Sequence, residues 1–271
     1  MTGLKAQLNR KLHECGRDPL SLFLLGCVIA AALITFMVLS FLLGYILWQG
    51  LPNIETGLFA LQYNSENVSL FPALVDTVLM VIMALAIATP LGIFAAVYLV
   101  EYASRGNRLV SLVRVTADTL AGIPSIVYGL WGFYTLRPFM VDLQLSEQGF
   151  GIFTAAVVLA VMIIPYASSL SAEFISMVPK ELKEGAYSLG GTRLDVIRRV
   201  IFPVAGSGIF ASYILALGRA LGETMAVTML IGNTNILPTS FTSTGNTMAS
   251  VIANQFGEAD GLKLSSLFAI G

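Results

Sequence analysis

Charged residues are scarce in this chain: they make up 11% of its 271 residues, whereas hydrophobic residues make up 56%. An average soluble domain carries roughly a quarter charged residues. So large a deficit excludes a soluble globular protein and predicts that most side chains face lipid or one another. We therefore expect an all-α integral membrane protein with several spanning helices.

Histidine and cysteine are nearly absent as well. The chain has one histidine, His13, and two cysteines, Cys15 and Cys27. A metal site needs three or four convergent ligands. Cys27 lies inside an apolar run, so a disulfide with Cys15 is not expected. We expect no metal site, no cofactor and no nucleic-acid partner.

The sequence does contain long apolar runs. A helix that spans a bilayer needs roughly 20 apolar residues. The first is about twice as long as the apolar core of a signal peptide, so we expect it to remain as a helix. A sixth run begins at Leu264 and stops at Gly271. The expected bundle has about six transmembrane helices with the last one truncated. The five longer runs cover residues 20–48, 71–100, 109–136, 151–170 and 206–232.

The basic residues predict the orientation of these helices. Positive residues gather on the cytoplasmic side of membrane proteins. This places the N-terminus in the cytoplasm and the loop 233–261 outside. Of the fifteen basic residues, four precede the first run, three follow the second and five follow the fourth: Lys5, Arg10, Lys11, Arg17; Arg105, Arg108, Arg114; Lys180, Lys183, Arg193, Arg198, Arg199.

A glycine-bearing stretch, GAYSLGGT at residues 185–192, superficially imitates a phosphate-binding loop. Gly191 occupies the position of the lysine that would contact the β- and γ-phosphates, and no buried strand precedes the stretch. We therefore expect no nucleotide site, and no enzymatic activity, in this chain.

The same region predicts a short helix over residues 180–189. Pro179 stands near its start, and Gly190 and Gly191 stand at its end. A helix of about ten residues is marginal alone, so it must pack against something. The residue types leave two interpretations open: a helix lying on the membrane surface, or a docking element for a soluble partner.

The motif around this helix favours docking. The stretch 184–203 resembles the cytoplasmic E-A-A-x3-G-x9-I-x-L-P loop of ABC importer permeases, with three size-conservative departures at Gly185, Val200 and Phe202. In that family the loop carries the coupling helix, which sits in a groove of the ATPase subunit. By this resemblance, the coupling residues are Glu184, Gly185, Ala186, Gly190 and Pro203.

Two further stretches, LAGIPSIVYGLWGF (120–133) and LGRALGETMAVTMLIGN (217–233), are similar to phosphate importer permeases of the PstC type. The resemblance implies a type I ABC importer permease, a MetI-like helical bundle in the bacterial inner membrane. Its implied partners are a PstA-like second permease, a PstB-like ATPase dimer and a PstS-like periplasmic phosphate-binding protein. We expect an N-terminal part (1–70), a permease core (71–271) and a cytoplasmic coupling loop (179–203).

Two charges inside the fifth run are candidates for the substrate pathway. Arg219 and Glu223 are four residues apart, so a continuous helix would place them on one face. One interpretation is that the charges neutralise each other. The other is that Arg219 attracts phosphate while Glu223 orients it, because a guanidinium matches phosphate oxygens in a bidentate geometry.

Other polar positions have structural interpretations. Asp76 is expected to reach water at the outer end of its helix, Asp118 to pair with Arg114, and Glu173 to be solvated near a helix end. Pro124 and Pro165 are expected to kink their helices.

Alternative functions remain open on the residues alone. An ABC permease for another oxyanion or small solute would have the same features. An ion-coupled secondary transporter would be expected to show broken helices and inverted repeats, which the sequence does not reveal. An intramembrane enzyme would need a nucleophile–base pair or a metal cluster, and none stands out.

Overall fold

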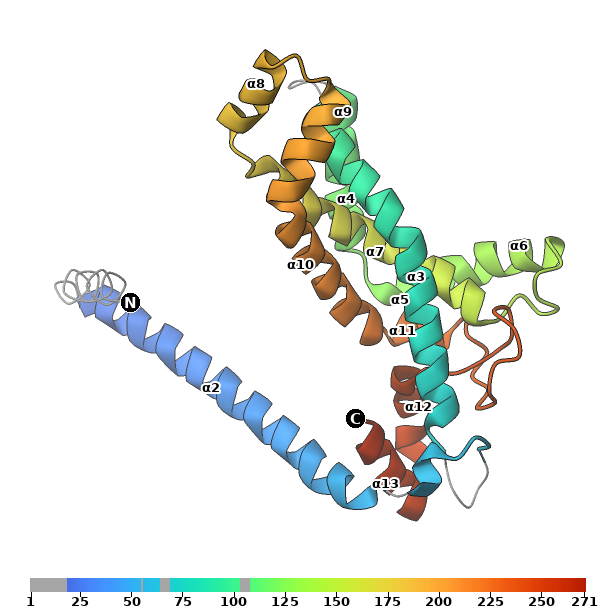
Figure 1. Ribbon diagram of the computed structural model, residues 1–271. Coiled ribbons are helices and arrows are strands. Elements are labelled where there is room, and N and C mark those ends of the chain that lie inside the picture. Colours follow the sequence, from blue (N-terminus) through green and yellow to red (C-terminus); the bar gives the residue numbers. More distant parts are fainter. Residues whose placement is uncertain (1–18, 55, 64–68, 103–107) are drawn as a thin grey trace.

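A computed structural model describes residues 19–54, 56–63, 69–102 and 108–271 (Figure 1). The N-terminal basic residues used for the orientation, together with His13 and Cys15, lie outside the described residues. The described part is helical, and its one β-type contact is an isolated bridge between Gly232 and Gly245.

Helices of very different length make up the fold. The long ones are α2 (Pro19–Gly50), α3 (Phe71–Val97), α7 (Ile152–Ser176) and α10 (Phe202–Leu221). The short ones are α4 (Arg108–Ala121), α5 (Ser125–Trp131), α6 (Arg137–Asp142), α8 (Lys180–Ser188), α9 (Arg193–Val196), α11 (Met225–Thr228), α12 (Met248–Gln255) and α13 (Gly261–Ile270). Three 3₁₀ turns are η1 (Leu51–Asn53), η2 (Thr56–Phe59) and η6 (Phe256–Glu258); three π-helical turns are η3 (Tyr98–Tyr102), η4 (Gly132–Leu136) and η5 (Ile197–Ile201).

Four of the described helical stretches are long and apolar enough to cross a membrane: Phe23–Asn53, Phe71–Tyr102, Ile152–Ser176 and Arg193–Leu221. The first, second and fourth predicted helices are thus confirmed. The fifth begins earlier than predicted, at Arg193, because α9 and η5 run without a break into α10, and it ends at Leu221 rather than at residue 232.

The third predicted helix is wrong as a single span. It is interrupted between α4 and α5, at residues 122–124 (Figure 1). Pro124 lacks an N–H and has the extended ψ of 138° that precedes a new helix rather than continuing the old one. The proline was expected to kink a helix, and it ends one instead. Pro165, in contrast, lies inside α7, which continues past it.

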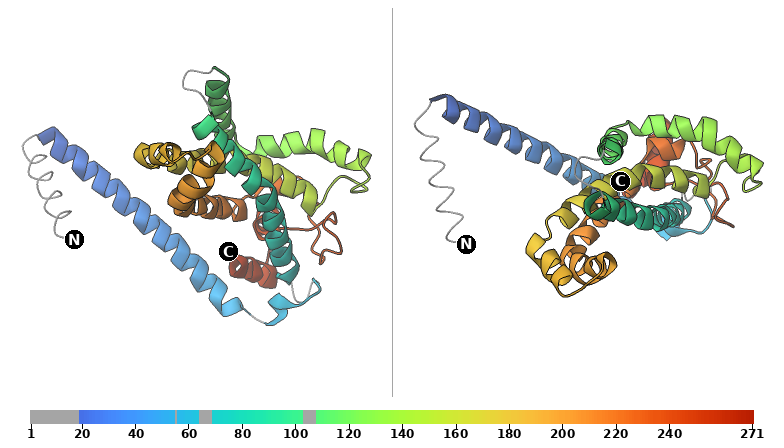
Figure 2. Two further views of the ribbon diagram at one scale, coloured as in Figure 1. Left: turned by 45° about the horizontal axis from the view of Figure 1, so that its top comes forward. Right: turned by 90° about the horizontal axis from the view of Figure 1, so that it is seen from above.

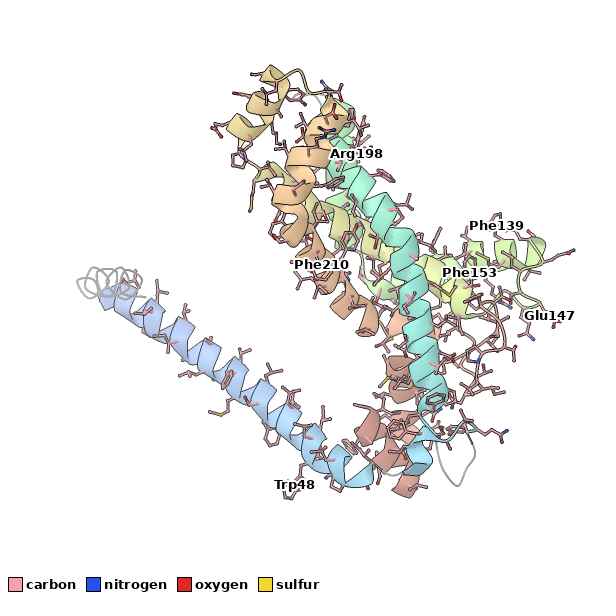
Figure 3. All side chains as sticks on the ribbon, in the orientation of Figure 1. Trp48, Phe139, Glu147, Phe153, Arg198 and Phe210 are labelled. Carbon is pink, nitrogen blue, oxygen red and sulfur yellow. The ribbon has the colours of Figure 1, made fainter. Side chains whose placement is uncertain are left out.

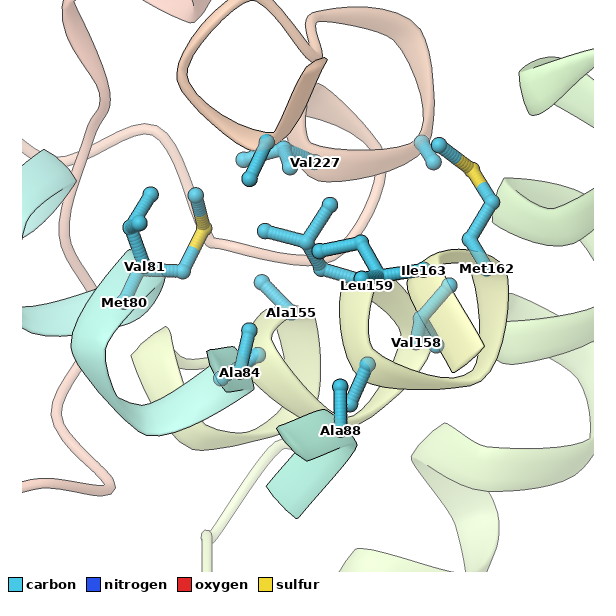
Figure 4. Close-up of a cluster of buried hydrophobic side chains, with 14 of the residues drawn as sticks. Met80, Val81, Ala84, Ala88, Ala155, Val158, Leu159, Met162, Ile163 and Val227 are labelled. Atoms are coloured by element: carbon cyan, nitrogen blue, oxygen red, sulfur yellow. The ribbon is translucent and has the colours of Figure 1, made fainter. Parts of the chain in front are cut away.

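The core forms around α7, which packs against α3, α10 and α4. Figure 4 shows small α3 residues, Ala84 and Ala88, facing Ala155 and Leu159 of α7. All four are at most 1% exposed. Small residues let helix backbones approach closely, which is how helices associate where lipid offers no hydrophobic driving force.

The helix α2 stands away from this core (Figures 1 and 3). Its large apolar side chains are exposed around the whole helix, with Trp48 80% exposed. Its contact with the rest of the chain lies at its C-terminal end, where the Tyr45 ring meets the Phe268 ring of α13 edge-on at 5.8 Å.

The two ends of α3 meet different parts of the molecule. The short helices α8 and α9 lie at the end where α3 finishes, while α12 and α13 lie at the end where it starts (Figure 1). Figure 2 shows α6 and the segment after it projecting sideways from the bundle. We call residues 229–247, which fold back onto the start of α3, the return loop.

Candidate functional site: a mid-bundle arginine and a two-faced surface helix

Arg219 and Glu223 do not share a helix face, which corrects the prediction from their spacing. Arg219 lies in the last turn of α10, but that helix ends at Leu221 and Glu223 follows its C-cap Gly222. The Glu223 Oε1 atom accepts the backbone N–H of Ala226 at 3.2 Å, at the start of α11. Within the described residues no ion pair joins the two charges. Mutual neutralisation is therefore not what keeps them in the bundle.

Arg219 is half-buried against an aromatic ring. Its Cζ atom lies 5.2 Å from the centroid of the Tyr166 ring of α7. Such a cation–π contact is worth about 0.5–2 kcal/mol, depending on how dry the site is. This is less than the roughly 2.5–3.5 kcal/mol that a charge costs at mid-bilayer. The ring therefore orients the guanidinium without fully compensating its charge.

The break in the third span lies near this arginine. The Tyr128 hydroxyl of α5, within electrostatic range of Arg219, donates a hydrogen bond of 2.8 Å to the Leu120 carbonyl, the last turn of α4. Ile123 N–H also donates to that carbonyl. Non-helical backbone is tolerated at membrane depth only where protein or a cavity covers it. A broken span, a tyrosine and an arginine thus occur together, although the sequence showed no broken helix.

On α4, Asp118 does not pair with Arg114 as expected. Its Oδ1 accepts a hydrogen bond from the Ser169 hydroxyl of α7 at 3.3 Å. The side chain thereby ties α4 to the central helix, three residues beyond Tyr166 on α7. Glu173, further along α7, is exposed as predicted.

The predicted short helix is confirmed as α8, and it has two faces. No residue of α8 is buried. Glu184 and Gly185 are exposed, and no described atom would lie within 4 Å of a Cβ at Gly185. Leu189, just after the helix, is 91% exposed. This face is open for a partner.

The other face of α8 meets the chain's own core. Ala186 packs against the cluster that includes Val178, Val196 and Ile197. Lys183, one turn earlier, reaches Glu101 of η3, with its Nζ 2.5 Å from Glu101 Oε1. Ala186 therefore helps to seat α8 on the bundle.

Glycine and proline fix the ends of this region. Gly190 has φ +84°, a left-handed conformation that ends α8 without steric cost. Gly191 N–H then donates to the Ala186 carbonyl at 3.1 Å. Pro203, which has no N–H to donate, is the second residue of α10 and lies two positions after the last residue of the π-helical turn η5. That wider turn lets the helix pass the proline without ending.

At the opposite end of α3, Asp76 is fully buried and does not reach water, contrary to expectation. Its Oδ2 accepts the backbone N–H of Asn246 in the return loop at 2.9 Å. The Thr77 Oγ1 accepts the N–H of Met248 at 3.0 Å. Asp76 Oδ1 has no hydrogen-bond partner among the described residues.

A polar cavity of about 850 Å³ opens beside the return loop. It is bounded by the segment after α6 on one side and by the return loop on the other. Its lining is mostly hydroxyl and amide side chains with one acid, Glu147, which Figure 3 shows at the edge of the molecule. The polar lining includes Gln144, Ser146, Gln148, Thr228, Asn233, Thr234, Ser240, Thr242, Ser243 and Thr244.

A solved structure shares the fold of this chain. A chain of the MetNI methionine ABC transporter, solved in inward-facing conformations, matches it with a TM-score of 0.53 and 18% identity, covering 73% of this chain and 84% of that one. At so low an identity the match shows a shared fold alone.

Sequence comparison then gives the family. Residues 88–257 match the model of the binding-protein-dependent transport system inner membrane component, and the chain belongs to that family. It is 43% identical over 208 residues to the phosphate transport system permease protein PstC of Haemophilus influenzae, covering 70% of this chain and 65% of that protein. The alignment thus spans less than two thirds of that relative's length.

Two other relatives carry the same name. The PstC protein of Mesorhizobium japonicum is 40% identical over 230 residues, covering 76% of this chain and 69% of that protein. That of Xylella fastidiosa strain Temecula1 is 33% identical over 287 residues, covering 97% and 87%. The expected MetI-like permease fold and the family resemblance are confirmed.

Proposed function

We propose that this chain is the transmembrane permease subunit of an ATP-driven importer that moves inorganic phosphate into the cytoplasm. The names of the relatives support phosphate as substrate. The observation in the molecule that carries the proposal is Arg219, a half-buried cation within the bundle that forms no ion pair with a described acid. A guanidinium in that setting suits a tetrahedral oxyanion.

We infer the partners from the resemblance to the permease family. We infer a PstA-like permease completing the pathway, a PstB-like ATPase dimer engaging the open face of α8, and a PstS-like binding protein delivering phosphate from the periplasm. Glu184, Gly185 and Gly190 would meet or shape the ATPase contact, while Ala186 and Pro203 hold the coupling region in place. The N-terminus and the coupling loop 179–203 would be cytoplasmic, and the polar cavity would face outward.

In the pathway, Arg219 would attract phosphate and Glu223 would limit how tightly it is held. Conduction needs release as well as binding. The Glu223 Oε1 accepts the Ala226 N–H, which would leave Oε2 to accept a hydrogen bond from a protonated phosphate oxygen.

The test is uptake by the assembled complex in proteoliposomes. Arg219→Gln should abolish phosphate uptake while the subunits still co-purify. The exchange Arg219→Glu with Glu223→Arg should also be inactive, because the arginine would leave α10. Wild-type uptake in the exchanged protein would refute a pathway role for Arg219.

The same vesicles separate the alternatives. Import that follows ATP supply supports the proposal, and import that follows an ion gradient supports a secondary transporter, an alternative kept by the break between α4 and α5. Competition by sulfate or another oxyanion would identify a different substrate. For orientation, a cysteine at Thr244 or at the exposed Ser240 should be labelled from outside, and one at Thr192 should not.

A further inference from the structure

The helix α3 and the π-helical turn η3 that continues it form one helical span, Phe71–Tyr102, which is attached at its two ends to two different elements, the surface helix α8 and the return loop. We propose that α3 is the mechanical link between them, so that Lys183 and Glu101 at one end, and Asp76 and Thr77 at the other, carry movement of α8 to the return loop. The inference rests on the proposed ATP-driven import, in which α8 is the element that the ATPase moves.

At the α8 end, the attachment is a half-buried ion pair. Lys183 and Glu101 are 82 residues apart in sequence, and their side chains are only 16% and 12% exposed. The other ion pair among the described residues, Arg199 with Asp195, is 3.8 Å long, and the arginine is 82% exposed. Because removal of one partner leaves the other charge uncompensated, a buried pair holds far more firmly than an exposed one. Of α8, only Lys183 and Ala186 are not exposed, so the pair is a principal fastening of that helix.

At the other end, two adjacent side chains of α3 hold the end of the return loop and the start of α12, which follows it directly. Asp76 accepts Asn246 N–H and Thr77 accepts Met248 N–H, both over about 170 residues of sequence. Gly245 lies so close to the Asp76 carboxylate that a Cβ there would overlap it. The loop is therefore pressed against this turn of α3, and a shift of α3 must move it.

Between these ends, one face of α3 is packed against the core. Asp76 and Glu101 are separated by about 37 Å of helix axis at a rise of 1.5 Å per residue. Along that length Ala84, Ala88 and Ala96 are completely buried. A densely packed interior transmits strain rather than dissipating it. The packed helix thus supplies a continuous path between the two attachments.

The decisive measurement is the number of ATP molecules hydrolysed per phosphate imported by the reconstituted complex. Lys183→Met and Glu101→Gln should raise this ratio about fivefold or more, in the usual range of coupling between sites. The exchange of Lys183→Glu with Glu101→Lys should bring it back toward the wild-type value. Arg199→Met is the matched control on the exposed pair and should leave the ratio unchanged.

The attachment at the start of α3 is tested with Thr77→Val, which keeps the side-chain shape but removes the acceptor for Met248. It should raise the same ratio of ATP hydrolysed to phosphate imported. Combining it with Lys183→Met should add little, because either change alone already breaks the connection between α8 and the return loop. Thr119→Val is the control. The Thr119 Oγ1 donates to the carbonyl four residues earlier at 2.7 Å, as the Thr77 Oγ1 does at 2.6 Å, but it accepts no hydrogen bond from another described segment. A normal ratio in Lys183→Met and Thr77→Val, or equal losses of hydrolysis and import, would overturn the inference.

A second readout does not require phosphate import. With Cys15 and Cys27 replaced by serine, the labelling rate of Ser240→Cys in the return loop should change when the ATPase binds ATP. The change should disappear in Lys183→Met and persist in Arg199→Met. A nucleotide-dependent change that survives Lys183→Met excludes the link. Absence of phosphate import by the wild-type complex, with the labelling pattern intact, would instead refute the proposed substrate.

Discussion

The helices α2 and α7 are both apolar enough to span a membrane, yet they differ in how much of their surface the rest of the chain buries. None of the most apolar stretch of α2 is buried within the chain, whereas 67% of that of α7 is. The difference lies in what each helix packs against. On α7, small residues such as Ala156 and Ala160 alternate with large ones such as Leu159 on a buried face, and on α2 bulky leucine, isoleucine and phenylalanine side chains are exposed all round. Hydropathy thus indicates which segments can cross, and only the contacts with neighbouring helices show which ones pack.

The largest effect that sharpens this comparison should come from enlarging a small residue of α7. Ala160 is fully buried, so Ala160→Leu forces extra volume into the core and should cost about 1–3 kcal/mol or more. The matched change Ala31→Leu in the exposed α2 should be nearly neutral. Thermal unfolding in detergent measures both, and equal losses in the two variants would break the comparison.

A smaller effect is expected where α3 and α10 approach each other. A Cβ added at Gly92 would lie 2.5 Å from the Tyr213 hydroxyl oxygen, which donates to the Thr89 carbonyl at 3.0 Å. Gly92→Ala should displace that hydroxyl and cost about 1–3 kcal/mol, the range for a buried polar group left without its partner. Gly44→Ala in α2 meets nothing within 4 Å among the described atoms. It should leave the unfolding temperature unchanged, and a loss as large as that of Gly92→Ala would speak against an isolated α2.

The smallest effect concerns the attachment of α2 itself. Tyr45→Ala removes the edge-on contact with Phe268, and such aromatic pairs contribute about 0.5–1.5 kcal/mol. We expect faster proteolysis in the segment after α2, with the α3–α7 core intact. Phe41, one turn earlier, is 69% exposed, and its one ring contact among the described residues is with Tyr45. Phe41→Ala should therefore have little effect, and equal sensitivity of the two variants would contradict the contact.

Features that depend on neighbouring residues could be predicted from the sequence. The runs that became α2, α3 and α7 are long and apolar, and α8 is bounded by Pro179 and the Gly190–Gly191 pair. Local chemistry is enough to specify such elements.

Other features could not be predicted because they depend on where helices end or meet. The prediction that Glu223 shares a helix face with Arg219 assumed a helix that continues past Gly222. The interruption at residues 122–124 lies inside a long apolar run, so a hydropathy profile does not reveal it. Two contacts join segments that are far apart in the sequence: Lys183 with Glu101, and Asp76 with Asn246. A signal did exist for Asp76, since it is a lone charge in an apolar run, but the sequence does not name a partner.

The interruption between α4 and α5 has a consequence for how the chain is made. As it leaves the ribosome, α2 can enter lipid by itself, because its backbone is internally bonded and its whole surface is apolar. The α4–α5 segment has no such freedom, because its backbone is not helical at residues 122–124. Gly122 and Pro124 stay exposed on this chain even though α7 packs against α4 and α5. We therefore expect stable insertion of this segment to depend on a covering surface outside the chain, which ties the third segment of the bundle to assembly of the complex.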